Sequence, residues 1–330
     1  VDTVAHTPMV ETKINAEAFK QAARLEGLET DISSTYSRQN PSVIAEQNYE
    51  PSDLSGPLLS LDSFWIQTFG NPEAFYLYQG GAILSTGYIF NPKFSFRTSA
   101  KITLVENFDK FNFLQDAQQS TLPRVRTLIR EYVSGRNIAL ETAYAHYFDK
   151  LSENTFVQVY GGYLETMFGG VGTEIMYRPV DSSIYFGLDL NYVKQRDFDS
   201  ETAFFDYSTF TGHASVYWEP EFLPDMQLSV SAGQFLAKDK GVNIDIAKRF
   251  DTGIVVGAYA AFTNVSAAEY GEGSFTKGFY ISIPFDMFSF APAKGRGKIP
   301  WVPIGRDGGQ MLNRPLTLRD QTELRSPFYD

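Results

Sequence analysis

Apolar and polar side chains alternate with a period of two in many segments of this chain. The clearest segment runs from Ser183 to Gln195. Only a β-strand places every second side chain on the same face, and a long strand with one apolar and one polar face is typical of a wall between lipid and water. The pattern therefore predicts a membrane β-barrel. The apolar face of this segment carries Ile184, Phe186, Leu188, Leu190 and Tyr192, and the polar face carries Ser183, Gly187, Asp189 and Asn191.

The same alternation recurs between Ser63 and Phe288, and residues typical of turns, such as Gly169 and Gly170, separate the segments. The pattern predicts an all-β fold in which residues 57–290 form an antiparallel transmembrane β-barrel. We expect about 12–14 strands, because each tilted crossing of a bilayer needs roughly 9–11 residues. Further alternating segments cover residues 94–106, 137–148, 226–234, 242–249 and 279–285.

The expected positions of the longer connections conflict with this strand count. Bacterial barrels built from one chain normally have an even number of strands and carry their long loops at one end. Longer polar connections are expected near residues 107–124, 196–208 and 263–276. Our strand placement puts them at different ends, so at least one strand is miscounted.

The two ends of the chain do not follow the alternation. Residues 1–56 are predicted to form a periplasmic segment with a helix over Ala16–Leu28, capped by Asn15, and then a polar linker. Residues 291–330 are rich in proline and glycine, which disfavour strand pairing. We expect them to form a tail in the periplasm or against the barrel. The N-terminus carries no signal-peptide pattern, so we expect a processed chain or a piece of a longer precursor.

Composition narrows the possible functions. The net charge of −11 argues against nucleic acid as a partner, because phosphate binding needs a basic surface. The chain has no cysteine, which excludes disulfides and thiolate metal sites. Its 28 Phe and 19 Tyr suit the aromatic girdles of a barrel. The chain contains no run of 18 consecutive apolar residues, so no transmembrane helix is predicted.

The sequence shows no catalytic, cofactor or metal constellation. The histidines His6, His146 and His213 lie far apart and lack the spacing of metal ligands. No nucleophile elbow or phosphate-binding loop appears. We therefore expect neither an enzyme nor a bound cofactor. Three alternatives stay open: a barrel enzyme acting on lipid or saccharide with His146 or His213 as base, a general porin, and a soluble carbohydrate-binding β-protein.

Charged and amide side chains on the polar strand faces are the candidate lining of the lumen. They could line a passage for a hydrophilic substrate, including an anionic one. They could equally pair with one another and fill a narrow interior. These candidates are Arg97, Lys101, Glu141, Glu174, Arg178, Asp189, Asn191, Gln227, Asn243, Asp245 and Arg249.

The segment from Thr276 to Ile283 resembles the assembly signal of outer-membrane barrels. Such a signal has a polar residue, a glycine and alternating hydrophobic residues on the closing strand. Its residues here are Gly278, Phe279, Ile281 and Ile283. The alternative interpretation is an ordinary amphipathic strand, since such a signal normally ends the chain.

Three stretches resemble the YjbH/GfcD family: Asp62–Gln67, Leu122–Arg126 followed by Tyr132, and Trp301–Pro315. The resemblance covers most of residues 60–330. Members are outer-membrane β-barrel proteins encoded with group 4 capsule or exopolysaccharide export systems of Gram-negative bacteria. The resemblance implies an outer-membrane protein that assists exopolysaccharide or capsule export, among lipid and the other components of that system. Members carry an additional N-terminal half, so the rest of the precursor is a further expected partner. The family supplies no catalytic residues.

Overall fold

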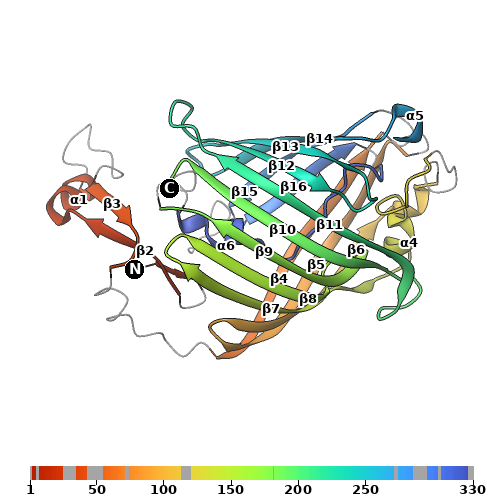
Figure 1. Ribbon diagram of the computed structural model, residues 1–330. Helices are drawn as coiled ribbons and strands as arrows, with labels where there is room; N and C mark the ends of the chain where they lie inside the picture. The colour runs from red at the N-terminus through yellow and green to blue at the C-terminus, as the bar shows by residue number, and fades with distance from the viewer. Residues whose placement is uncertain are drawn as a thin grey trace.

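The strands of the described residues close into a β-barrel in the computed structural model (Figure 1). The structure describes residues 2–4, 7–24, 35–42, 55–70, 74–112, 120–180, 182–270, 274–284, 296–303 and 306–325. Within these ranges 13 strands form the wall, which confirms the all-β barrel and agrees with the expected range of strand numbers. The strands are β4 (Gly56–Phe69), β5 (Tyr76–Asn91), β6 (Phe94–Glu106), β7 (Ile138–Ser152), β8 (Thr155–Tyr163), β9 (Phe168–Tyr177), β10 (Ile184–Arg196), β11 (Phe204–Trp218), β12 (Met226–Gln234), β13 (Lys240–Arg249), β14 (Val255–Thr263), β15 (Thr276–Pro284) and β16 (Arg296–Pro303).

The barrel closes through a parallel pair of strands. Each strand from β4 to β16 is antiparallel to the next, so the first and last strands of an odd-numbered set run in the same direction. At the seam, Val302 lies opposite Thr68 and Pro303 opposite Phe69. The Thr68 hydroxyl donates to the carbonyl of Val302 at 2.8 Å. The expectation of an even number of strands is therefore wrong.

Strand β16 lies in the stretch that was expected to avoid strand pairing. Pro300 nevertheless stands opposite Tyr280 of β15. Proline is tolerated here because β16 pairs only briefly with β4, so its other edge needs few N–H donors. Two predictions fail at this point: the barrel does not end at residue 290, and the segment with Gly278 lies in β15, one strand before the closing strand. Gly169 and Gly170 likewise lie in β9 and not in a turn.

The apolar strand faces point away from the barrel axis, as the alternation predicts. On β10, Leu190 is 58% exposed, whereas its neighbours Asp189 and Asn191 are 6% and 3% exposed. The Phe, Ile and Leu rows of the described strands are thus not sealed in a core.

All three longer connections lie at one end of the barrel. They follow β6, β10 and β14, which run in the same direction because three strands of alternating direction lie between each of them and the next. We call this the loop end and the opposite one, with short connections such as residues 92–93 and 153–154, the turn end. The conflict over the positions of these three connections therefore came from misplaced strands.

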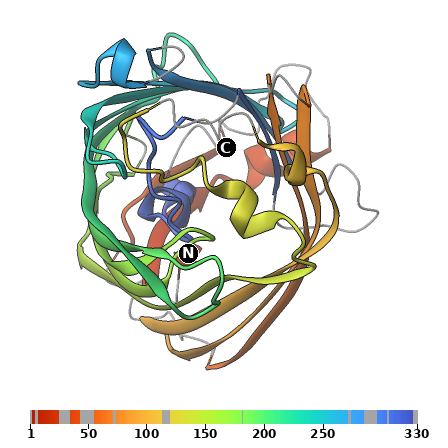
Figure 2. The ribbon, with the colours of Figure 1, turned by 90° about the vertical axis from the view of Figure 1, so that its right-hand side faces the viewer.

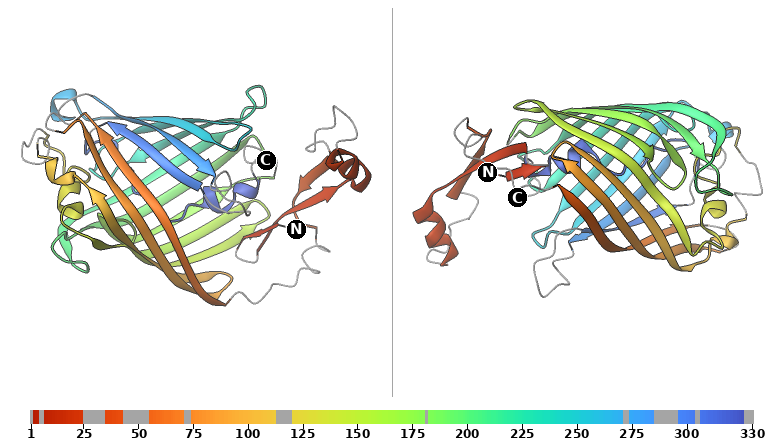
Figure 3. Two further views of the ribbon diagram at one scale, coloured as in Figure 1. Left: turned by 180° about the vertical axis from the view of Figure 1, so that it is seen from behind. Right: turned by 90° about the horizontal axis from the view of Figure 1, so that it is seen from below.

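The N-terminal residues form a small sheet beside the turn end (Figure 3). It contains β1 (Asp2–Val4), β2 (Thr7–Ile14) and β3 (Tyr36–Gln39), with the helix α1 (Ala16–Ala23) between β2 and β3. The predicted cap is confirmed, since the Asn15 side chain accepts a hydrogen bond from the N–H of Ala18 at 3.2 Å. Residues 25–28 of the predicted helix and most of the predicted linker lie outside the described residues, although β3 falls within that linker.

Strand β2 also contacts the barrel. Met9 and Val10 are fully buried and pack with Phe148 and Leu318 in one apolar cluster at the turn end. The division into separate domains stays a prediction. Among the described residues, no helix has the length and apolar character needed to cross a membrane.

Candidate functional site: the barrel lumen

The C-terminal residues 306–325 run lengthwise through the barrel, and we call them the plug segment. They include α6 (Leu318–Gln321) and the short helix η4 (Glu323–Arg325). Figure 2, viewed from the loop end, shows α6 in blue inside the ring of strands. Asp307 contacts the loop end, whereas Arg325 donates to the carbonyls of Arg178 and Met9 at the turn end, at 2.8 and 2.7 Å. The lumen is therefore occupied along its length.

Asp307 anchors the plug segment at the loop end. Its carboxylate accepts hydrogen bonds from the backbone N–H groups of Val125, Arg126 and Thr127 at 2.8, 2.8 and 3.0 Å. The Thr127 hydroxyl also donates to it at 2.8 Å. Burial raises the pKa of Asp307, and these donors oppose that rise because they favour the charged form. The carboxylate thus ties the connection between β6 and β7 to the plug segment.

Replacing Asp307 with alanine should loosen this connection. The substitution leaves buried N–H donors without an acceptor, which costs about 1–3 kcal/mol for each group that stays dry. We expect faster proteolysis of residues 120–133 in the folded barrel. Asp251→Ala, at an exposed position in a turn-end connection, is the matched control and should cleave like the parent. Equal cleavage of both variants would contradict the anchoring role.

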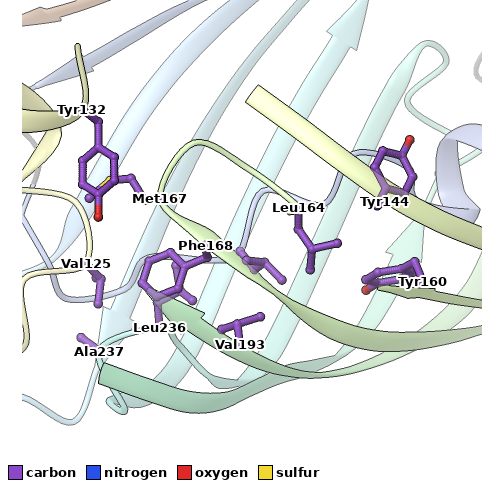
Figure 4. Packing of buried hydrophobic residues seen from close by; sticks show 11 residues of the cluster. Val125, Tyr132, Tyr144, Tyr160, Leu164, Met167, Phe168, Val193, Leu236 and Ala237 are labelled. Atoms are coloured by element: carbon purple, nitrogen blue, oxygen red, sulfur yellow. The ribbon is translucent and has the colours of Figure 1, made fainter. Parts of the chain in front are cut away.

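An apolar cluster also packs against the connection between β6 and β7, next to the residues that Asp307 binds. The short helix α4 (Ile129–Val133) lies across the loop end, and Tyr132 is 5% exposed there. Its hydroxyl donates to the carbonyl of Arg196, and burial raises the pKa of Tyr132. Figure 4 shows the cluster that spans this connection and the barrel wall. Its buried members are Val125, Tyr132, Tyr144, Tyr160, Leu164, Met167, Phe168, Val193, Leu236, Ala237 and Leu312.

Arg314 joins the plug segment to two carboxylates of the wall. Its Nη1 lies 2.9 Å from Glu174 Oε2, and its Nη2 lies 3.6 Å from Asp189 Oδ1. Burial lowers the pKa of Arg314, but Glu174 and Asp189 outweigh this and hold it above its ordinary value. Glu174 also accepts from the N–H of Leu318 at 3.0 Å. One cation of the plug segment thus neutralises two acids of the wall.

A second buried arginine lies near the turn end. Arg178 is 1% exposed, and its guanidinium stacks 4.0 Å from the centre of the Tyr185 ring. Its Nη2 lies 3.7 Å from Glu219, and its Nη1 donates to the carbonyl of Arg319 at 2.9 Å. The wall and the plug segment therefore share this cation.

Most of the predicted lumen candidates meet a partner inside the barrel. Lys101 pairs with Glu141 at 2.9 Å. Asn191 donates to Asp189 at 2.8 Å. Their proposed role in lining a passage stays a prediction. Gln227 donates to Tyr185 and Glu219 at 2.8 and 2.7 Å, and Asp245 accepts from Tyr280 at 3.1 Å. Asn243 and Arg249 are half-buried on the same strand as Asp245. Arg97 forms no hydrogen bond or ion pair with the described residues.

The sequence pattern gives no indication of the partners that the plug segment supplies. Asp307, Arg314 and Arg325 lie in a stretch without any periodic pattern, so no strand face could be assigned to them. The available signal was the recurrence of arginine in a tail rich in proline and glycine.

The plug segment fills the lumen unevenly. Inward side chains of the β8–β12 wall are almost fully buried, as Gln158 at 0% and Gln227 at 2% exposure show. In contrast, Ser60 and Asp62 on β4 are exposed. The Ser60 hydroxyl donates to Asp62 at 3.0 Å. The side of the lumen along β4 is therefore accessible to water.

The two histidines of the enzyme hypothesis are both buried. His146 Nε2 lies 2.8 Å from Gln158 Oε1, and the His213 ring packs 4.9 Å from the Phe235 ring. Across the described ranges, no group of three or more acidic or histidine side chains could hold a metal ion.

Comparisons with known proteins give a consistent result. A family model described as "Exopolysaccharide biosynthesis protein YbjH" matches residues 1–323. The chain is also similar to a protein named "Uncharacterized lipoprotein YjbH" from Escherichia coli strain K12. The two are 45% identical over 325 residues, which is 97% of this chain and 46% of the relative. This chain thus spans about half the length of that relative.

Proposed function

This chain belongs to the YjbH family, whose description names exopolysaccharide biosynthesis, and we propose that it is an integral outer-membrane β-barrel of a Gram-negative bacterium. In this proposal the barrel assists the export or assembly of an exopolysaccharide or capsule. It performs no chemistry itself. The observation that carries the proposal is the continuous apolar outer face of a closed barrel, because such a surface is stable only against lipid or a partner.

The outer face has the composition expected of a lipid-facing wall. Large apolar side chains such as Leu61, Leu104 and Phe210 are 69%, 73% and 70% exposed. Aromatic pairs lie near both ends. Trp65 stacks on Tyr78 near the loop end with ring centres 5.4 Å apart, and Tyr88 contacts Phe90 near the turn end at 5.1 Å. Paired aromatic girdles are typical of membrane barrels at the two interfaces with water.

The position of the longest connection, residues 107–137 between β6 and β7, supports one orientation. Outer-membrane barrels normally place short turns in the periplasm and longer loops outside the cell. The turn end and the N-terminal sheet would then face the periplasm. We propose this sheet as the docking surface for periplasmic components of a polysaccharide export system and for the remaining part of a longer precursor.

The lumen supports a passive role. His146 and His213 are buried against Gln158 and Phe235, away from water, which disfavours a base at the barrel rim. The water-accessible wall near Ser60 offers hydroxyl groups that a hydrated sugar polymer could exchange for water.

Membrane fractionation and gel mobility test the location. We expect the protein in the outer-membrane fraction, and we expect the unboiled sample to migrate differently from the boiled one, since a closed barrel resists detergent until heated. Deletion of the gene should lower the exopolysaccharide at the cell surface. Recovery in the soluble fraction would exclude the membrane location, and unchanged exopolysaccharide in the deletion strain would exclude the export role.

A further inference from the structure

Arg97 is a cation inside the barrel that has no counter-ion among the residues that the structure describes. It points inward from β6, and its cross-strand neighbours are Gly87 on β5 and Tyr144 on β7. Among the described residues it forms no ion pair or hydrogen bond, and its Nε is buried without a partner. Lys101, further along the same strand, has Glu141 at 2.9 Å. The neighbours of Arg97 on its own face carry no carboxylate: they are Ser85, Ile89, Ser95, Ser99, Thr142 and His146.

The Arg97 side chain borders a cavity between the wall and the plug segment. The cavity has a volume of about 360 Å³, within the range of small-molecule sites. Gly87 beside Arg97 adds no side chain to this space. The wall supplies a row of hydroxyl groups, and the plug segment supplies an apolar side. The plug segment contributes Pro315 and Leu316, and the wall also contributes the apolar residues Leu58 and Leu59. The hydroxyl residues of the lining are Ser60, Ser85, Thr86, Thr98, Ser99, Thr142 and Tyr144.

A guanidinium that has lost part of its hydration is stabilised by an anion, because the anion replaces the lost hydrogen bonds to water. The planar fork of arginine matches a carboxylate with two parallel hydrogen bonds. Ser60 is exposed to the open side of the lumen, so a ligand can reach the cavity from water. Asp62, the nearby acid on β4, accepts from Ser60 and forms no ion pair with Arg97.

We propose that this cavity binds the carboxylate of an acidic sugar, with Arg97 holding the anion and the hydroxyl row contacting the ring. The inference rests on the proposed export function and gives it a substrate class: a polysaccharide that contains acidic sugar residues. The apolar side chains Pro315 and Leu316 suit the C–H face of a sugar ring, and the hydroxyl side suits its O–H groups.

Titration of the purified full-length chain in detergent with D-glucuronate, and with D-glucose as the neutral match, tests the proposal. We expect the parent to prefer glucuronate. Arg97→Gln should weaken glucuronate binding at least about tenfold, as expected for loss of a charge-assisted hydrogen bond, and Arg97→Lys should retain part of it. The substitution removes no hydrogen bond or ion pair within the described residues, so the variants should fold. Lys248→Gln, an exposed site on β13, is the matched control and should bind like the parent.

The outcomes separate this inference from the proposed function. A heat-modifiable barrel that binds glucose and glucuronate alike, or that binds neither, would overturn the acidic-sugar site and leave the membrane function standing. The site is also wrong if Arg97→Gln binds glucuronate as tightly as the parent, or if Lys248→Gln weakens binding equally. A protein that shows no heat-modifiable barrel contradicts the proposed function first.

Discussion

Arg314→Met is expected to weaken the docking of the plug segment by about 3–5 kcal/mol, the usual cost of removing one partner from a buried ion pair. The substitution leaves Glu174 and Asp189 as buried acids without their cation. Their side chains are only 3% and 7% exposed, so water cannot replace the lost guanidinium. Hydrogen exchange of residues 306–325 in the folded barrel measures the free energy of opening.

A triple variant is the sharper control. Arg314→Met combined with Glu174→Gln and Asp189→Asn removes the cation and both acids together. Neutral groups of similar size often replace a buried ion set at little cost, so we expect this variant to recover most of the lost protection. If the single variant exchanges like the parent, or if the triple variant is no better than the single one, the charge-pairing account fails.

Ending the chain after Gly305 should open the lumen. This truncation keeps all strands of the described barrel and removes the plug segment. We expect larger single-channel currents in planar bilayers than for the full-length chain, because buried inward groups such as Gln158 and Gln227 would then face water. Equal currents before and after truncation would mean that the plug segment does not limit the passage.

Adding the plug segment back as a separate peptide tests whether the truncation has damaged the barrel itself. A synthetic peptide of residues 306–325 should reduce the current of the truncated barrel, since its Arg314 would again meet Glu174 and Asp189. A scrambled peptide of the same composition has the same net charge and should leave the current unchanged. A block by both peptides would indicate nonspecific attraction by the acidic wall.

Local pattern predicted the parts of the fold that local geometry controls. Leu190 and Asn191 are neighbours in a strand, so their side chains point to opposite faces. Asparagine is a preferred residue at the start of a helix, and the Asn15 side chain accepts a hydrogen bond from the N–H of Ala18. Strand β16 escaped detection because proline and glycine usually oppose pairing. A seam strand tolerates Pro300, however, and only closure of the barrel reveals that β16 is at the seam.

The lumen shows the same division. Inward charges on the strands could be named in advance, since the polar face of each strand was visible, but their partners could not. Arg314 meets Glu174 only after the chain has closed the wall and turned back through it. Likewise, the barrel places Gly87 and Tyr144 beside Arg97, and neither can serve as its counter-ion.

The amino-acid sequence by itself determined a β-barrel and the outward face of its strands, because an alternation of two residues is a property of each strand alone. The tertiary structure decided the parallel seam, the common side of the three predicted loops, the filling of the lumen and the lack of a counter-ion for Arg97 among the described residues. These features depend on which distant segments meet, and the order of apolar and polar residues carries no direct signal of such meetings.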